Sequence, residues 1–137
     1  MRKTPVNPWT WQDRRGFTQA WRVEAPAAIL FVSGQVPLDD DGNLVAPGDF
    51  DGQARRTFEN LGRVLDEAGG TFGDIVKVTV YLTDIRYRET VYRVMGRWLK
   101  GVYPVSTGLV VEALARPEWL VEIDATAVIS EPEETGR

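Results

Sequence analysis

The chain has 137 residues, the length of one domain, and 43% of them are hydrophobic, which suffices for a buried core and excludes disorder throughout. Sixteen basic and twenty acidic residues give a net charge of −4, which disfavours a nucleic-acid-binding protein that relies on a broad positive field. Cysteine and histidine are both absent, so disulfides, thiol nucleophiles, Ser-His-Asp triads and zinc sites built from these residues are excluded.

The N-terminal part of the chain predicts two strands and a turn. Residues 1–8 carry little hydrophobic pattern, whereas residues 16–24 alternate between apolar and polar side chains, and residues 27–33 form a short apolar run typical of a buried strand. Residues 39–42, Asp-Asp-Asp-Gly, indicate a solvated turn. A calcium loop is the alternative, but no glutamate follows at the spacing that an EF-hand loop requires.

Two helices and a strand follow. Apolar residues recur every three or four positions over residues 49–68, with Asp49 as the expected N-cap and two glycines as the C-terminal stop. Residues 75–83 alternate as a strand does, and residues 87–100 show a second helical stripe that ends at Gly101.

Two strands, at about residues 105–113 and 119–129, close the chain. This order of elements predicts an α+β domain of two layers, with one mixed sheet and two helices on one of its faces. The other face of the sheet mixes apolar with polar side chains, so we expect it to pack on another subunit.

The chain is expected to form a single domain over residues 1–137, with its core at about 16–129 and a polar tail at 130–137. No apolar run approaches the ~20 residues of a membrane span, and the N-terminus lacks the apolar segment of a signal peptide. We therefore expect a cytoplasmic protein that does not bind membranes.

Chemistry in this chain must use carboxylates, hydroxyls, Lys, Arg, Tyr or backbone groups. The common phosphate-binding loops and the nucleophile elbow are absent. Glu122 and Asp124 lie two residues apart and point to the same face of the last strand, so they form a candidate pair of carboxylates. A solvated or inter-subunit face is the alternative interpretation.

Three segments resemble the RidA/YjgF family of small-molecule deaminases. They are FVSGQVPLDDDGNLV at 31–45, QARRTFENLGRVLDEAGGTFGDIVKVTVYLTD at 53–84 and LVEIDATAV at 120–128, and their order and spacing make the set specific. The resemblance implies a chorismate-mutase-like α+β domain that assembles as a homotrimer, with small-molecule clefts between subunits. We expect neither a metal nor a cofactor.

The same resemblance assigns roles to five positions. Glu122 is where the family has the glutamate that orients the attacking water, and Gly34 is the glycine of its SGQ segment. Phe17 replaces the tyrosine that closes the cleft, and Gly108 is the residue two after the arginine that grips the substrate carboxylate. The position of that arginine is taken by Ser106, which offers one hydroxyl in place of a permanent charge with five donors.

A relocated arginine could restore the grip on a carboxylate, and Arg88 and Arg116 are the two candidates; solvent-exposed charge is the alternative for both. The main hypothesis is a divergent deaminase of an imine or enamine that is less acidic, or more aromatic, than an α-imino acid. The alternative is a non-catalytic trimer that binds a small metabolite. An endoribonuclease or translation inhibitor is disfavoured by the negative charge and the absence of histidine.

Overall fold

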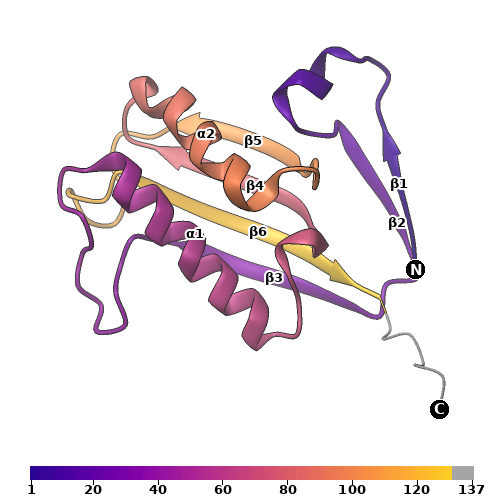
Figure 1. The fold of residues 1–137 in the computed structure, drawn as a ribbon, viewed down its shortest axis with the longest axis horizontal. Helices are drawn as coiled ribbons and strands as arrows, with labels where there is room; N and C mark the ends of the chain where they lie inside the picture. The colour runs from indigo at the N-terminus through magenta and orange to yellow at the C-terminus, as the bar shows by residue number, and fades with distance from the viewer. Residues whose placement is uncertain (131–137) are drawn as a thin grey trace.

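Two helices cover one face of a four-stranded mixed sheet in the computed structural model, which describes residues 1–130 (Figure 1). The strands of this sheet are β3 (Ala28–Gln35), β4 (Ile75–Leu82), β5 (Val105–Val110) and β6 (Val121–Ile129). The helices are α1 (Phe50–Glu67) and α2 (Arg88–Leu99), and the short 3₁₀ helices η2 (Phe72–Asp74) and η3 (Ile85–Tyr87) precede β4 and α2. The strand order is β3-β6-β4-β5, with β6 antiparallel to both neighbours and β5 parallel to β4. The predicted α+β fold is confirmed.

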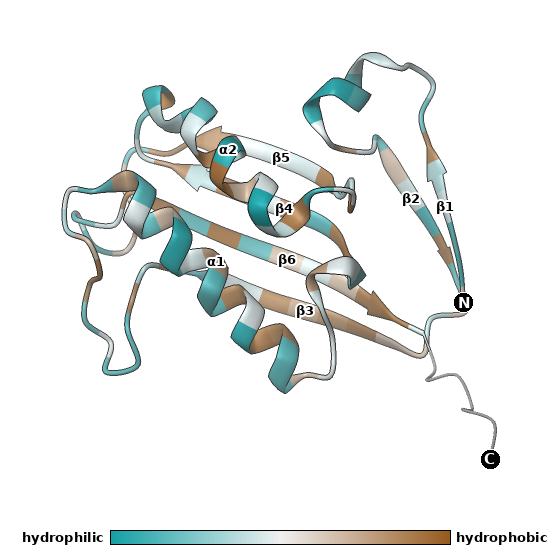
Figure 2. Cartoon of the chain, viewed as in Figure 1, coloured by the Kyte–Doolittle hydropathy of each residue, from teal (hydrophilic) through white to brown (hydrophobic). Residues whose placement is uncertain are grey.

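The core lies between the helices and the sheet. α1 begins as predicted, because the Asp49 side chain accepts a hydrogen bond from the backbone N–H of Gly52. Hydrophobic and hydrophilic stretches alternate along α1 and β6, as expected for elements with one buried face (Figure 2). The fully buried side chains of the core are Ala54, Phe58, Leu61, Ile75, Val78, Val80, Val91, Val94, Val121, Ile123 and Ala127. None of the helices within residues 1–130 is long and apolar enough to cross a membrane.

A hairpin at the N-terminus corrects the sequence prediction. β1 (Arg2–Val6) pairs antiparallel with β2 (Ala20–Glu24), and the 3₁₀ helix η1 (Trp11–Arg15) lies between them. The strand predicted over residues 16–24 begins only at Ala20, and β1 was not predicted. β1 is almost entirely exposed, so burial imposes no alternation on its sequence. The hairpin forms a second, separate sheet beside the end of the main sheet where β5 begins (Figure 1).

Two hydrogen bonds join the hairpin to the segment before β5. The backbone N–H of Thr18 donates to the carbonyl of Pro104 at 3.2 Å, and Nε1 of Trp21 donates to the carbonyl of Tyr103 at 2.9 Å. Nζ of Lys3 lies 4.4 Å from the centre of the Trp21 ring, a cation–π contact within the hairpin. The segment that follows η1 is therefore held next to α2 and β5.

The solvated turn predicted at residues 39–42 is confirmed. Asp39 accepts hydrogen bonds from the backbone N–H groups of Asp41 and Asn43, both at 2.9 Å. The neighbouring Asp40 forms ion pairs with Arg56 and Arg63 of α1, and these arginines hold the pKa of Asp40 below its usual value. The acidic run thus ties the turn to α1.

Candidate functional site

Glu122 lies on the outer face of the sheet, which we define as the face opposite to the helices. Val121 and Ile123, its neighbours on β6, are fully buried in the core, so Glu122 and Asp124 take the other face, as predicted. The ladder places Glu122 directly opposite Tyr81 of β4. Glu122 is half-buried, with both adjoining strands beside it.

Gly34 makes room for this carboxylate. Between Val32 and Gln35 the ladder of β3 with β6 contains an irregularity, with one more residue on β3 than on β6. A Cβ atom at Gly34 would lie 2.7 Å from Cδ and 2.9 Å from Cγ of Glu122, closer than ordinary contact allows. The resemblance paired these two residues in one cleft, and here the Glu122 side chain packs directly on the Gly34 backbone.

The surroundings of Glu122 shift its titration. Burial raises the pKa of Glu122 above its usual value, and the negative charge of Asp124 raises it further. Oη of Tyr81 donates a hydrogen bond to Oδ2 of Asp124 at 2.9 Å, and this bond in turn raises the pKa of Tyr81. Tyr81 therefore fixes the carboxylate that perturbs Glu122. A carboxyl whose pKa is moved toward neutrality is suited to proton transfer.

A second group of candidate residues lines a cavity of about 230 Å³ between the N-terminal segment, α2 and β5. Its lining residues are Arg14, Arg15, Phe17, Arg88, Tyr92 and Ser106. Three of the residues predicted from the sequence, Phe17, Arg88 and Ser106, are thus brought together although they come from distant parts of the chain.

Within one chain, this cavity and Glu122 lie on opposite faces of the sheet. Ser106 pairs with Val78 in the ladder, and Val78 points toward the helices. Gly108 is on the same helix-covered face, because a Cβ atom there would lie 2.8 Å from Oη of Tyr92. One chain therefore presents two half-sites: the Glu122 half on the outer face and the Ser106 half on the helix side of β5.

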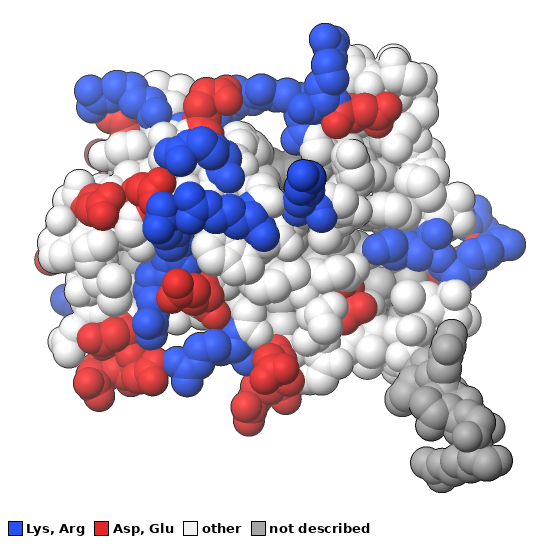
Figure 3. Space-filling view, in the orientation of Figure 1, with Lys and Arg blue, Asp and Glu red and all other residues white. Residues whose placement is uncertain are grey.

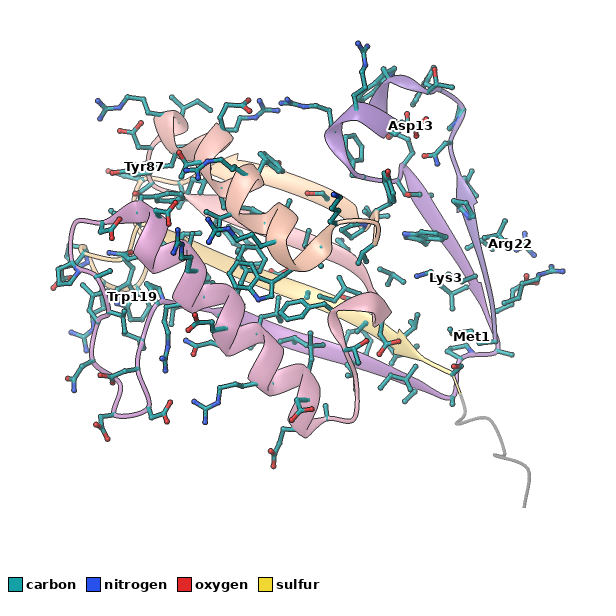
Figure 4. All side chains as sticks on the ribbon, in the orientation of Figure 1. Met1, Lys3, Asp13, Arg22, Tyr87 and Trp119 are labelled. Carbon is teal, nitrogen blue, oxygen red and sulfur yellow. The ribbon has the colours of Figure 1, made fainter. Side chains whose placement is uncertain are left out.

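The two candidate arginines differ in position. Arg88 begins α2 and lines the cavity, where its guanidinium carbon lies 5.5 Å from the centre of the Tyr92 ring. Arg116 is exposed in the loop that leads to Trp119, which lies at the end of the sheet far from Asp13 and η1 (Figure 4). The structure thus brings Arg88, and not Arg116, to the side of Ser106.

Sequence reasoning missed Arg14, Arg15 and Tyr92. Arg14 and Arg15 belong to η1, which was not predicted, and Tyr92 lies on the side of α2 that faces β5. The only local signal was a pair of adjacent arginines, separated from Phe17 by Gly16.

A groove larger than the cavity that contains Ser106 lies elsewhere on the described surface. It has a volume of about 760 Å³ and runs between β3, the loop after it and α1. Of the residues predicted from the sequence it contains only Gly34, and it contains neither Glu122 nor Ser106. The two half-sites hold most of the residues predicted from the sequence, so they are the better candidates for chemistry.

Comparison with known proteins identifies the family and agrees with the fold. Residues 14–129 match the protein family described as Endoribonuclease L-PSP. The chain is 40% identical over 112 residues to Protein DfrA of Myxococcus xanthus, a match that covers 82% of this chain and 84% of that protein. It is 35% identical over 117 residues to the 2-iminobutanoate/2-iminopropanoate deaminase of Mus musculus, covering 77% and 86% of the two chains. Among solved structures it resembles YyfB of Yersinia pestis, a protein of unknown function of the conserved Rid protein family. The TM-score is 0.84 and the sequence identity is 30%, and the match covers 94% of this chain and 100% of YyfB.

Proposed function

Because the chain belongs to the RidA/YjgF family, we propose that it is a deaminase that hydrolyses the imine or enamine of a small molecule. The observation that carries this proposal is the half-buried carboxyl of Glu122, packed on Gly34, with a pKa raised by its surroundings. The deaminase of Mus musculus adds support, because it acts on imines and is 35% identical to this chain.

Glu122 moves the protons of the reaction. Its carboxylate accepts a proton from water while the water oxygen bonds to the imine carbon, and the electron pair of the C=N bond moves to nitrogen. Glu122 then returns the proton to that nitrogen. Glu122 then takes the hydroxyl proton of the resulting carbinolamine and passes it to the NH2 nitrogen. As the C–N bond breaks, ammonia leaves with the bonding electron pair and the oxygen becomes the carbonyl of the product.

The complete site requires a second copy of the chain. Phe31 on the outer face of β3 is 83% exposed, and Ile29 beside it is also exposed, which suits a sheet face that packs on another subunit. If the edge strand β5 of one copy lies against the outer face of its neighbour, the Ser106 half of the first copy is set beside the Glu122 half of the second. We therefore propose the homotrimer that the family resemblance implies, with the substrate bound between subunits.

Substitution of Glu122 tests the chemistry. The purified protein is incubated with imines generated in situ from a panel of amino acids by an amino-acid oxidase, and ammonia release is measured. The wild type should accelerate release for at least one imine, Glu122→Gln should abolish the acceleration while folding normally, and Glu112→Gln, a change at an exposed glutamate in the loop after β5, should leave it unchanged. Full activity of Glu122→Gln would exclude Glu122 as the proton-transfer group.

A non-catalytic trimer that binds a metabolite is the second candidate, and Ser106 favours it, because the family resemblance places the substrate-gripping arginine at that position. This candidate predicts that a metabolite raises the melting temperature without turnover, since a ligand at one hundred times its Kd adds about 2.7 kcal/mol to the free energy of unfolding. No acceleration for any imine, together with such stabilisation, would replace the deaminase by this binder.

A further inference from the structure

Three arginines surround the cavity that contains Ser106. Arg14 and Arg15 come from η1, and Arg88 comes from the first turn of α2. Lys and Arg side chains gather around the hollow between the N-terminal segment and α2 (Figure 3). At about 230 Å³ the cavity offers the space of roughly seven or eight water molecules, which is the size of a small metabolite.

One carboxylate partly balances these three charges. Oε1 of Glu89 lies 3.1 Å from Nη1 of Arg88 and 3.5 Å from Nη2 of Arg15, and the Glu89 side chain is exposed. Three guanidinium groups against one carboxylate leave a surplus of two positive charges at the cavity. Such a surplus favours a ligand that brings two negative charges.

Two hydroxyl groups add neutral hydrogen-bond donors. Oγ of Ser106 is buried and has no hydrogen-bond partner within the described residues. Oη of Tyr92 lies against the backbone of Gly108, because a Cβ atom added at Gly108 would lie only 2.8 Å from it. A buried hydroxyl without a partner is costly, so a ligand oxygen at Ser106 would remove an energetic penalty.

We propose that this cavity binds a compact dianion, either a short dicarboxylate or a phosphate monoester, through Arg14, Arg15 and Arg88, with Ser106 and Tyr92 as further donors. Guanidinium groups bind carboxylate and phosphate oxygens through paired, charge-assisted hydrogen bonds. The idea that this dianion is the substrate rests on the function proposed above. The idea that the cavity binds a dianion does not depend on that function. The proposal replaces the expectation of a less acidic substrate, because η1 supplies the charge that Ser106 lacks.

Calorimetry with defined probes tests the proposal on the full-length protein at constant ionic strength. The probes are succinate and inorganic phosphate, with acetate as the monoanion and succinamide as the neutral analogue. Succinate or phosphate should bind at least about tenfold more tightly than acetate, and succinamide should not bind. The stronger of the two dianions distinguishes a dicarboxylate from a phosphate ligand.

Matched variants locate the site. Arg14→Gln, Arg15→Gln and Arg88→Gln should each weaken dianion binding by about tenfold or more, since each removes a charged hydrogen-bond donor. Arg97→Gln, on α2 but outside the cavity lining, should leave binding unchanged. Equal affinity for acetate and succinate, or undiminished binding by all three cavity variants, would overturn the proposal.

The proposal and the proposed function fail separately. Imine hydrolysis without dianion binding would refute the anion site and leave the deaminase. Dianion binding without hydrolysis of any imine would refute the deaminase and leave the anion site.

Discussion

Replacement of Gly34 by alanine tests whether Glu122 must lie where the structure places it. The new methyl group would lie 2.7 Å from Cδ of Glu122, whereas carbon atoms in contact prefer about 3.5–4.0 Å. The carboxyl must therefore move by about 1 Å, and a displacement of this size can reduce the rate about 100-fold. The φ angle of Gly34 lies outside the left-handed region, so the backbone itself tolerates alanine.

The assay measures kcat/KM for imine hydrolysis together with the melting temperature. We expect kcat/KM to fall about 100-fold. The free energy of unfolding should fall by only roughly 1 kcal/mol, since the end of the Glu122 side chain is able to swing away. A change of this size lowers the melting temperature by roughly 4 °C in a domain of this length.

Gly96→Ala is the matched control. Gly96 lies within α2, and a Cβ atom there meets no heavy atom within 4 Å. Alanine should stabilise the helix by about 0.5–1 kcal/mol and leave activity unchanged. If Gly34→Ala kept kcat/KM within about twofold of the wild type, a displacement of the carboxyl by this distance would not matter, and the role given to Glu122 would be refuted.

Three further predictions concern titration and assembly. Burial, and further the charge of Asp124, raises the pKa of Glu122, so its contribution to stability is present below its unfolded pKa and is lost as pH rises through its folded pKa. Glu122→Gln should therefore flatten this part of a profile of unfolding free energy against pH. An unchanged slope would contradict the raised pKa. Hydrogen bonds from Arg86 lower the pKa of Asp84 to about 2, so the contribution of Asp84 to stability is present above its unfolded pKa and is lost as pH falls toward about 2. Asp84→Asn should therefore lose less stability in acid than the wild type, as measured by chemical denaturation at stepped pH. The wild type should sediment as a trimer and Phe31→Glu, on the exposed outer face, as a smaller species, and a monomeric wild type at micromolar concentration would contradict the shared site.

The helices and the central strands could be predicted because burial on one face imposes a period on their sequences. Phe58 and Leu61 of α1 recur at helical spacing because both are fully buried against the sheet. In β4 the alternation runs through Val78, Val80 and Leu82, but it fails at Val76, where the ladder with β6 carries an extra residue. A period of two counted back from Val78 places Val76 in the core, whereas the fully buried residue is Ile75.

The arginine cluster could not be predicted from local patterns. Arg15 and Glu89 lie 74 residues apart in the chain, and their contact depends on how the hairpin docks beside α2. That docking is fixed by hydrogen bonds to the backbone carbonyls of Tyr103 and Pro104, which any residue at those positions could supply. From the sequence, only Arg88, at the start of the second helix, and Arg116, in the loop before the last strand, were considered as replacement arginines.

The two half-sites depend on the fold to different degrees. Glu122 is placed by the core itself, because a slip of one residue in β6 would exchange it with the buried Val121 or Ile123. Arg14 and Arg15 are placed by a short segment outside the core, with exposed side chains. If both proposals hold, changes in that segment would alter which anion is bound without disturbing the sheet. The proposed proton-transfer group would then lie on the rigid part of the fold, and the proposed anion recognition on the part that is free to vary.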